Sequence, residues 1–319
     1  MAFRLSFLVT GAALAAAATS ASAGLVFNIS YTAAVTGNAN FAAIQTDVNL
    51  VAAKFSSLYS DNVTLNFTID ASPGGLGSSL FSPAFFRGSY AQVRTALAGD
   101  SKSADDATAV ASLPGAAPIG PGANQWFLTS ANAKAVGLVA ANNAASDGTY
   151  TFTSDLNTFD FDPSNGITAG EYDFIGTTEH EFSELMGRTN QLDNPGFGYT
   201  AFDLFRFTAP GTRDFTGGAG QSCGVYYSIN SGATNEKGYN CTDPGNADNQ
   251  DWDSSVPSDP FNAFGTPGVV NALSNTGIQV MDVIGWDRAS ANSVPEPGSA
   301  ALTLLAGGLL WRQRRRKSA

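Results

Sequence analysis

Residues 177–188 read TTEHEFSELMGR and contain His180, the only histidine of the 319-residue chain. Glu181 follows His180 directly, and Glu184 stands four residues after it. Residues four positions apart lie on the same face of an α-helix, so an imidazole and a carboxylate would point to one side. The apolar residues of the stretch share one helical face, and Gly187 stands where a helix would end. The stretch therefore predicts a helix that presents two potential metal ligands together.

A divalent metal ion accepts such a pair of ligands. Imidazole nitrogen and carboxylate oxygen both bind zinc at roughly 2.0–2.2 Å. Glu181 would reach a water on that ion without being a ligand itself, and we predict that it acts as the general base. A helix on a solvated surface carries the same residue types, however, and the pattern His-Glu-x-x-Glu also arises by chance. The rest of the chain must decide between a metal site and a solvated face.

Regular apolar periodicities surround this helix and predict the other elements. Alternating apolar and polar residues predict β-strands, and apolar residues at three- and four-residue steps predict amphipathic helices. Gly- and Pro-rich loops dominate residues 71–124 and most of the chain beyond residue 190. The expected strands are 25–32, 63–70, 125–129 and 147–154, and the expected helices are 41–58, 89–98, 103–112, 130–138 and 274–285.

This layout predicts a single domain of the α+β class at residues 24–290. Its N-terminal lobe, about 24–190, has an α/β-type order of strands and helices around a twisted mixed sheet. Its C-terminal lobe, about 191–290, is rich in loops and ends in a closing helix. The sequence contains no internal repeat and no linker-like run that would divide this domain.

The first residues have the composition of an export signal. Residues 1–23 consist of one arginine, an apolar run and the small residues of a cleavage site. We therefore expect a signal peptide that is cut between Ala23 and Gly24, and we exclude it from the fold.

Residues 294–319 have the features of a second targeting segment. Pro295, Glu296 and Pro297 precede an apolar run, shorter than the roughly 18 residues of an ordinary membrane span, and a basic cluster at 312–317. This order resembles the PEP-CTERM sorting signal of Gram-negative bacteria, which an exosortase cuts near the Pro-Glu-Pro. The resemblance implies export through the Sec machinery and a place at the cell surface or in the extracellular matrix. The C-terminal segment would anchor the protein in the inner membrane, transiently or stably. A plain membrane anchor is the alternative.

The expected mature chain is strongly acidic. Without Arg4 and the five basic residues at 312–317, 10 of the 16 basic residues remain against all 27 acidic ones, a net charge near −17. Such a surface repels nucleic acid and anionic lipid, and we expect neither as a partner.

The chain has two cysteines, Cys223 and Cys241. An exported protein can oxidise such a pair, whereas a reducing compartment keeps the thiols free. We therefore predict a disulfide between them, with free thiols as the alternative.

Three segments together resemble the zincin metalloproteases, specifically secreted bacterial matrixin-like members of the metzincin clan. They are EYDFIGTTEHEFSELMGR at 171–188, YTAFDLFRFTAPGTRDF at 199–215 and LSNTGIQVMDVIGWD at 273–287. The resemblance covers most of the expected domain, although the N-terminal half matches mainly in pattern. It implies a zincin-like fold, a bound zinc ion and hydrolysis of peptide bonds by metal-activated water. His180 and Glu184 would hold the metal, and Glu181 would be the catalytic base.

The chain departs from the family's pattern of three histidines. When the sequence from His180 is aligned with the family motif His-Glu-x-x-His-x-x-Gly-x-x-His, Glu184 and Asn190 occupy the second and third histidine positions. A third ligand must therefore be a carboxylate or an amide, which shifts the metal preference from zinc toward harder ions such as manganese or calcium. The candidates, in order of preference, are Asp203, Asn190 and Asp193. An ion pair with Arg206 or Arg188 is the other role open to Asp203.

Two further acidic segments are candidate calcium sites. Residues 160–171 space their polar groups like an EF-hand loop, but the glycine is one place late and no clean helix precedes it, which favours a structural turn. Asp248, Asp251 and Asp253 surround Trp252. A solvated loop is favoured there over a calcium site.

The sequence thus predicts a secreted zinc-dependent metalloendopeptidase that acts on polypeptides. The alternative, from a different class, is a catalytically inactive surface or exopolysaccharide-matrix protein that keeps the zincin fold. Metal content and peptide cleavage by the purified protein separate the two.

Overall fold

The computed structural model describes residues 24–118, 125–192, 198–216, 223–241, 249–254 and 258–289. The predicted signal peptide, the sorting segment with Pro295, Glu296 and Pro297, and the candidate ligand Asp193 lie outside these ranges. Within them, no helix is both long enough and apolar enough to cross a membrane.

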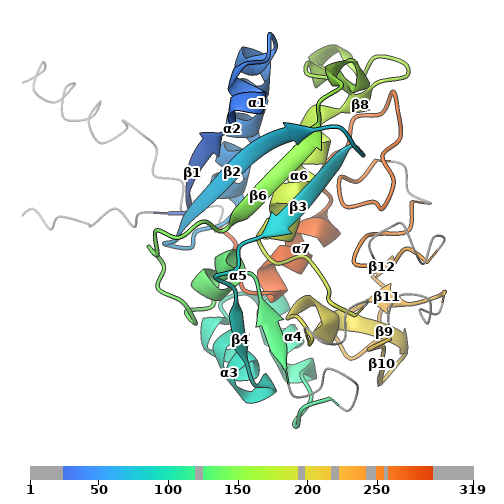
Figure 1. The fold of residues 1–319 in the computed structure, drawn as a ribbon. Coiled ribbons are helices and arrows are strands. Elements are labelled where there is room, and N and C mark those ends of the chain that lie inside the picture. Colours follow the sequence, from blue (N-terminus) through green and yellow to red (C-terminus); the bar gives the residue numbers. More distant parts are fainter. Residues whose placement is uncertain are drawn as a thin grey trace, which may run out of the picture.

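A four-stranded mixed sheet forms the centre of the first half of the chain (Figure 1). Its strands, in spatial order, are β1 (Val26–Tyr31), β2 (Thr64–Ser72), β6 (Gly148–Thr153) and β3 (Gly77–Phe81). The first three run parallel, whereas β3 pairs antiparallel with β6 and forms one edge of the sheet. Leu65, Phe67 and Ile69 of β2 are buried because successive side chains of a strand point to opposite faces.

Helices cover the apolar face of this sheet. Helix α2 (Phe41–Leu58) connects β1 to β2, since parallel neighbours need a crossover connection. Helix α6 (Phe174–Leu185) lies on the same face (Figure 1). Its Phe182 packs against Phe27 of β1 and Phe67 of β2, with ring centroids 5.7 and 5.0 Å apart. The sequence 177–188 is therefore built into the main core.

Smaller elements flank this core and make up the second half. Strand β4 (Phe86–Gly88) pairs with β5 (Trp126–Leu128), and β7 (Phe159–Asp160) pairs with β8 (Tyr172–Asp173). A second four-stranded sheet has the order β10 (Thr212–Arg213), β9 (Arg206–Ala209), β11 (Tyr226–Tyr227) and β12 (Lys237–Gly238). The other helices are α1 (Ala33–Thr36), α3 (Tyr90–Asp100), α4 (Ala104–Ser112), α5 (Ser130–Ala135) and α7 (Asn275–Val283). Short 3-10 helices occur at Leu156–Thr158, Pro163–Asn165 and Phe202–Phe205.

The α+β class is confirmed, as are the helices and strands that the apolar periodicities predict. Three expectations were wrong. Residues 77–81 form the edge strand β3 rather than a loop, residues 86–88 form β4, and the second half contains a small antiparallel sheet. Gly77-Ser78-Ser79 has no apolar alternation because this strand faces polar groups of α6 rather than the apolar core. The short strands of the second half bury aromatic side chains from several loops, which leaves no regular period in the sequence.

Candidate metal centre

Helix α6 is fixed at both ends by its own sequence. The Asp173 side chain caps its N-terminus, where Oδ1 accepts a hydrogen bond from Gly176 N and Oδ2 accepts one from Asn271 N. After the helix the chain turns at Gly187, whose φ is +114°. A Cβ at Gly187 would lie 2.7 Å from the Cβ of Asn132, so glycine is required for both conformation and space. The helix therefore presents a defined face to the second half of the chain.

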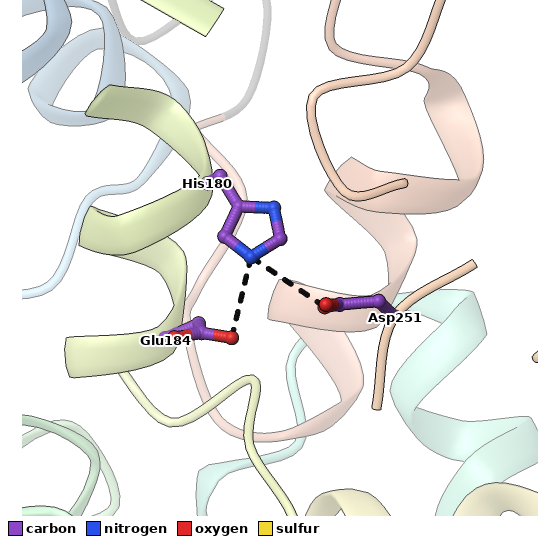
Figure 2. A group of neighbouring side chains, drawn as sticks. All are labelled: His180, Glu184 and Asp251. Atoms are coloured by element: carbon purple, nitrogen blue, oxygen red, sulfur yellow. Dashed lines mark ion pairs between the residues drawn. The ribbon is translucent and has the colours of Figure 1, made fainter. Parts of the chain in front are cut away.

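One imidazole and two carboxylates meet at this face, from His180, Glu184 and Asp251 (Figure 2). The Nε2 atom of His180 lies 3.3 Å from Glu184 Oε1 and 3.6 Å from Asp251 Oδ1. One ligand atom from each of the three residues lies within 4.8 Å of those of the other two. Among the described residues, this is the one group of three or more His, Cys, Asp or Glu side chains with such spacing. One nitrogen and two carboxylate oxygens are a ligand set that zinc and harder divalent ions accept.

Hydrogen bonds orient the two candidate ligands that come from α6. His180 Nδ1 lies 2.7 Å from the carbonyl oxygen of Pro260, so Nδ1 carries the proton and donates it. The lone pair of the neutral ring is then on Nε2, which faces the two carboxylates. Ser79 of β3 donates to Glu184 Oε2 at 2.6 Å, and the side-chain amide of Gln250 donates to Oε1 at 2.8 Å. Both side chains are thus held in the geometry in which they converge.

Arg188 orients the carboxylate of Asp251. Its guanidinium is fully buried and donates a 2.7 Å hydrogen bond to Asp251 Oδ1. It also donates to Ser183 Oγ at 2.7 Å and lies 4.4 Å from the ring centroid of Phe261. The third guanidinium nitrogen lies 3.7 Å from Glu184 Oε1. Arg188 therefore places one positive charge beside two carboxylates.

The charges of this group shift its pKa values strongly. Burial opposes the charged imidazolium, but the carboxylates of Asp251 and Glu184 outweigh it and raise the pKa of His180 to about 10. Burial also opposes the Glu184 carboxylate, yet the hydrogen bond and charge of His180 and the charge of Arg188 lower its pKa to about 2. The site thus attracts positive charge, which a proton or a metal ion can supply.

Glu181 lies beside the three converging side chains without joining them. It is buried, and its Oε2 has no hydrogen-bond partner among the described residues. Burial and the neighbouring Glu184 carboxylate raise the pKa of Glu181 well above its usual range. Its other oxygen lies 2.3 Å from the point that a Cβ at Gly77 would occupy, so β3 approaches the carboxylate through a glycine. A carboxyl group with an unused buried oxygen is available for proton transfer here.

Two polar cavities of about 370 Å³ each meet at Glu181. Gly77 and Glu181 line both of them. The first cavity also contacts Ser78, Ser79, Phe81, Thr189 and Asn190, and the second contacts Tyr172, Thr177, Pro260, Phe264 and Asn271. The cavities therefore lie along β3, on either side of the point where Glu181 approaches it.

Asp203, the preferred sequence candidate for the third metal ligand, lies outside the group of His180, Glu184 and Asp251. Its buried carboxylate accepts hydrogen bonds from the backbone nitrogen and the hydroxyl of Thr200, at 2.7 and 3.1 Å. Neither predicted ion pair is present, because Arg188 pairs with Asp251 and Arg206 pairs with another aspartate. Asp203 therefore caps a turn, and we replace it with Asp251 in the expected ligand set.

The other sequence candidates lie at several places. Asn190 lines the first cavity, as Glu181 and Glu184 do. Residues 160–171 form a turn in which Asp160 accepts hydrogen bonds from Thr168, as favoured from the sequence. Asp251, in contrast, was expected in a solvated loop and is only 2% exposed. It stands 63 residues after Arg188, and no spacing rule in the sequence connects it to the helix.

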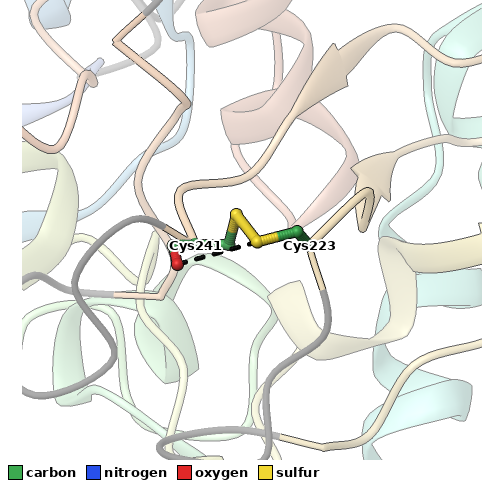
Figure 3. Close-up of a disulfide and its surroundings, with 2 residues drawn as sticks. All are labelled: Cys223 and Cys241. Carbon is green, nitrogen blue, oxygen red and sulfur yellow. Dashed lines mark hydrogen bonds between the residues drawn. A yellow bond between two sulfur atoms is a disulfide. The ribbon is translucent and has the colours of Figure 1, made fainter.

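The predicted disulfide between Cys223 and Cys241 is confirmed (Figure 3). The bond joins the two ends of a segment that contains β11 and β12. Its Cα atoms are 5.2 Å apart.

Compared with protein-family models, with curated proteins and with solved structures, the chain matches none. A function must therefore be argued from the site itself.

Proposed function

We propose that this protein is a metal-dependent endopeptidase with a zincin-like fold. The observation that carries the proposal is the convergence of His180 Nε2, Glu184 Oε1 and Asp251 Oδ1 beside the buried carboxyl of Glu181. The ligand atoms are already oriented by Pro260, Ser79, Gln250 and Arg188. Such outer hydrogen bonds are typical of metal sites. Zinc is the expected ion, and manganese or calcium is compatible with two carboxylate ligands.

The reaction follows from the two kinds of group present. A bound divalent ion would supply Lewis acidity, which acidifies water and polarises a peptide carbonyl. Glu181 would take the proton of the attacking water and pass it to the leaving amine. The ion's charge would also counter the repulsion from Glu184 and favour the ionised, basic form of Glu181.

Extended polypeptides are the substrate class that the surroundings favour. Strand β3 is an edge of the described sheet, and an edge strand can pair with an added chain. A peptide paired antiparallel with β3 would pass Glu181 and reach both polar cavities. Its residues before the cleaved bond would lie at the first cavity, toward Phe81, and those after it at the second cavity, beyond Gly77. Export, exosortase processing and a cell-surface location remain part of this proposal, on the strength of the two terminal sequence segments.

A second candidate is a catalytically silent protein of the same fold. The observation that favours it is the buried Arg188, which together with a protonated His180 would neutralise Glu184 and Asp251 without a metal. In that case the group would be a buried ion-pair network with a structural role. Such a structural network would be sufficient for a surface or matrix protein.

Metal content and peptide cleavage distinguish the two candidates. We expect the purified protein to retain about one divalent ion and to cleave an unfolded polypeptide. Glu181→Gln should lower the rate by about 10²- to 10⁴-fold with the metal retained. Glu179→Gln is the matched control, because Glu179 stands on the same helix but pairs with Lys54 of α2. No bound metal after equilibration with zinc or manganese, and no cleavage, would favour the silent protein.

A further inference from the structure

The segment that carries Asp251 is held by a small backbone ladder. Asn240 N donates to the carbonyl of Asp251 at 2.8 Å, and Asp253 N donates to that of Gly238 at 2.9 Å. Residues 238–240 are also bonded on their other side. There Tyr239 N donates to the carbonyl of Val225, which directly precedes β11, at 2.9 Å. Residues 238–240 are therefore the middle strip of this ladder. The segment that carries Asp251 lies beside the strip and is also bonded on its far side, because Trp252 N donates to the carbonyl of Phe261 and Ala263 N donates to that of Trp252.

The disulfide closes this ladder at its end. Cys241 directly follows Asn240, and Cys223 stands two residues before Val225. The bond therefore connects the middle strip covalently to the part of the chain that pairs with it (Figure 3). The two other candidate ligands stand on α6, which packs in the main core and carries neither cysteine of the disulfide.

We propose that the Cys223–Cys241 disulfide clamps Asp251 in its metal-binding position, so that the three-ligand site is complete only in the oxidised protein. This proposal rests on the metal centre proposed above, although not on peptide hydrolysis. Outer support of a ligand acts on metal affinity because a ligand that must be ordered at the moment of binding costs conformational entropy. Asp251 stands on the segment that the clamp holds, whereas His180 and Glu184 stand on α6.

The redox step is an ordinary thiol–disulfide exchange. The thiols of Cys223 and Cys241 lose two protons and two electrons as the S–S bond forms, and a second disulfide takes up these protons and electrons and becomes two thiols. A reduced chain would thus have a helix with two ligands and a loosened third. An oxidising compartment would then complete the site.

Hydrogen exchange tests the clamp without any metal. We compare the full oxidised chain with the chain that has been reduced with a phosphine, alkylated and freed of reductant, and with the Cys223→Ser/Cys241→Ser variant. The amides of Tyr239, Asn240 and Asp253 should exchange at least about tenfold faster without the bond, while those of α6 keep their protection. Unchanged exchange of these three amides would overturn the proposal. Equal loss of protection in α6 would also overturn it, because the bond would then stabilise the whole fold.

Zinc and manganese affinity supplies the second readout. Removing the disulfide should weaken binding by about tenfold or more, at the lower end of the effect of losing outer support. In an Asp251→Asn background the same removal should change the affinity less than about twofold, since the clamp acts through Asp251. An equal loss in both backgrounds overturns the clamp. If the oxidised protein binds neither ion, the proposed metal centre fails and the metal part of this inference fails with it, whereas hydrogen exchange still decides the structural part.

Discussion

Replacing Asp251 by asparagine tests the candidate ligand that the structure indicates and the sequence did not. The change keeps the size of the side chain and removes its negative charge. Asp251 has two roles in the structure, because its Oδ1 lies 3.6 Å from His180 Nε2 and accepts a 2.7 Å hydrogen bond from Arg188. We therefore expect both metal affinity and the stability of the metal-free protein to fall.

The size of each effect follows from these contacts. Removing one partner of a buried ion pair costs about 3–5 kcal/mol. The lower end applies here, because the asparagine oxygen still accepts a hydrogen bond and Glu184 remains 3.7 Å from Arg188. A loss of about 3 kcal/mol should lower the melting temperature by about 6–12 °C in a protein of this size. Since outer-shell losses alone weaken metal binding about 10- to 100-fold, loss of a ligand should weaken it by more than about 100-fold.

The matched control is Asp203→Asn, which changes an equally buried carboxylate outside the group. Its metal affinity should stay within about threefold of the unchanged protein. Competition against a chromophoric chelator measures the affinities, and thermal scans in the presence of chelator measure the metal-free stabilities. The reasoning is refuted if Asp203→Asn loses the metal or if Asp251→Asn keeps it.

Three further predictions concern the neighbourhood of the site and the pH response of the fold. Gly77→Ala should force Glu181 to move by about 1 Å, since the new Cβ would lie 2.3 Å from its Oε1, and should slow peptide cleavage about 100-fold at unchanged metal affinity. Gly74→Ala, which meets nothing within 4 Å, should leave the rate unchanged, and equal rates for both variants would contradict the assigned position of Glu181. Burial and the charge of Asp287 raise the pKa of Asp61 to about 8, so the folded protein binds more protons than the unfolded chain between about pH 4 and 8. The free energy of unfolding should therefore fall as the pH rises through this range, and urea titrations of Asp61→Asn should show a smaller fall; identical slopes would refute this. Saturating zinc at about 100 times Kd should add about 2.7 kcal/mol to that free energy, and a chelator should remove it.

The sequence alone predicted the parts of the site that are local. His180, Glu181 and Glu184 come to one side because a helix repeats every 3.6 residues, and the apolar steps around them identify that helix. The same reasoning predicts α2, β2 and β6, whose periods persist over several residues. The disulfide followed from two cysteines and the expectation of export.

The tertiary structure decided what completes the group. Asp251 stands 63 residues after Arg188, and the buried charge of that arginine, together with the ladder at 238–240, brings it to the helix. Asp203 was preferred because a loop after the helix could return and bring it to Glu184, but its carboxylate is used by the turn at Thr200. Edge strand β3 was missed for a related reason, because Gly77 lies against Glu181 and Ser79 bonds to Glu184, so neither meets an apolar face. The periodicity of apolar residues shows how a single segment packs against the core. A polar site is formed instead by contacts between segments that are far apart in the sequence, and their separation follows no period.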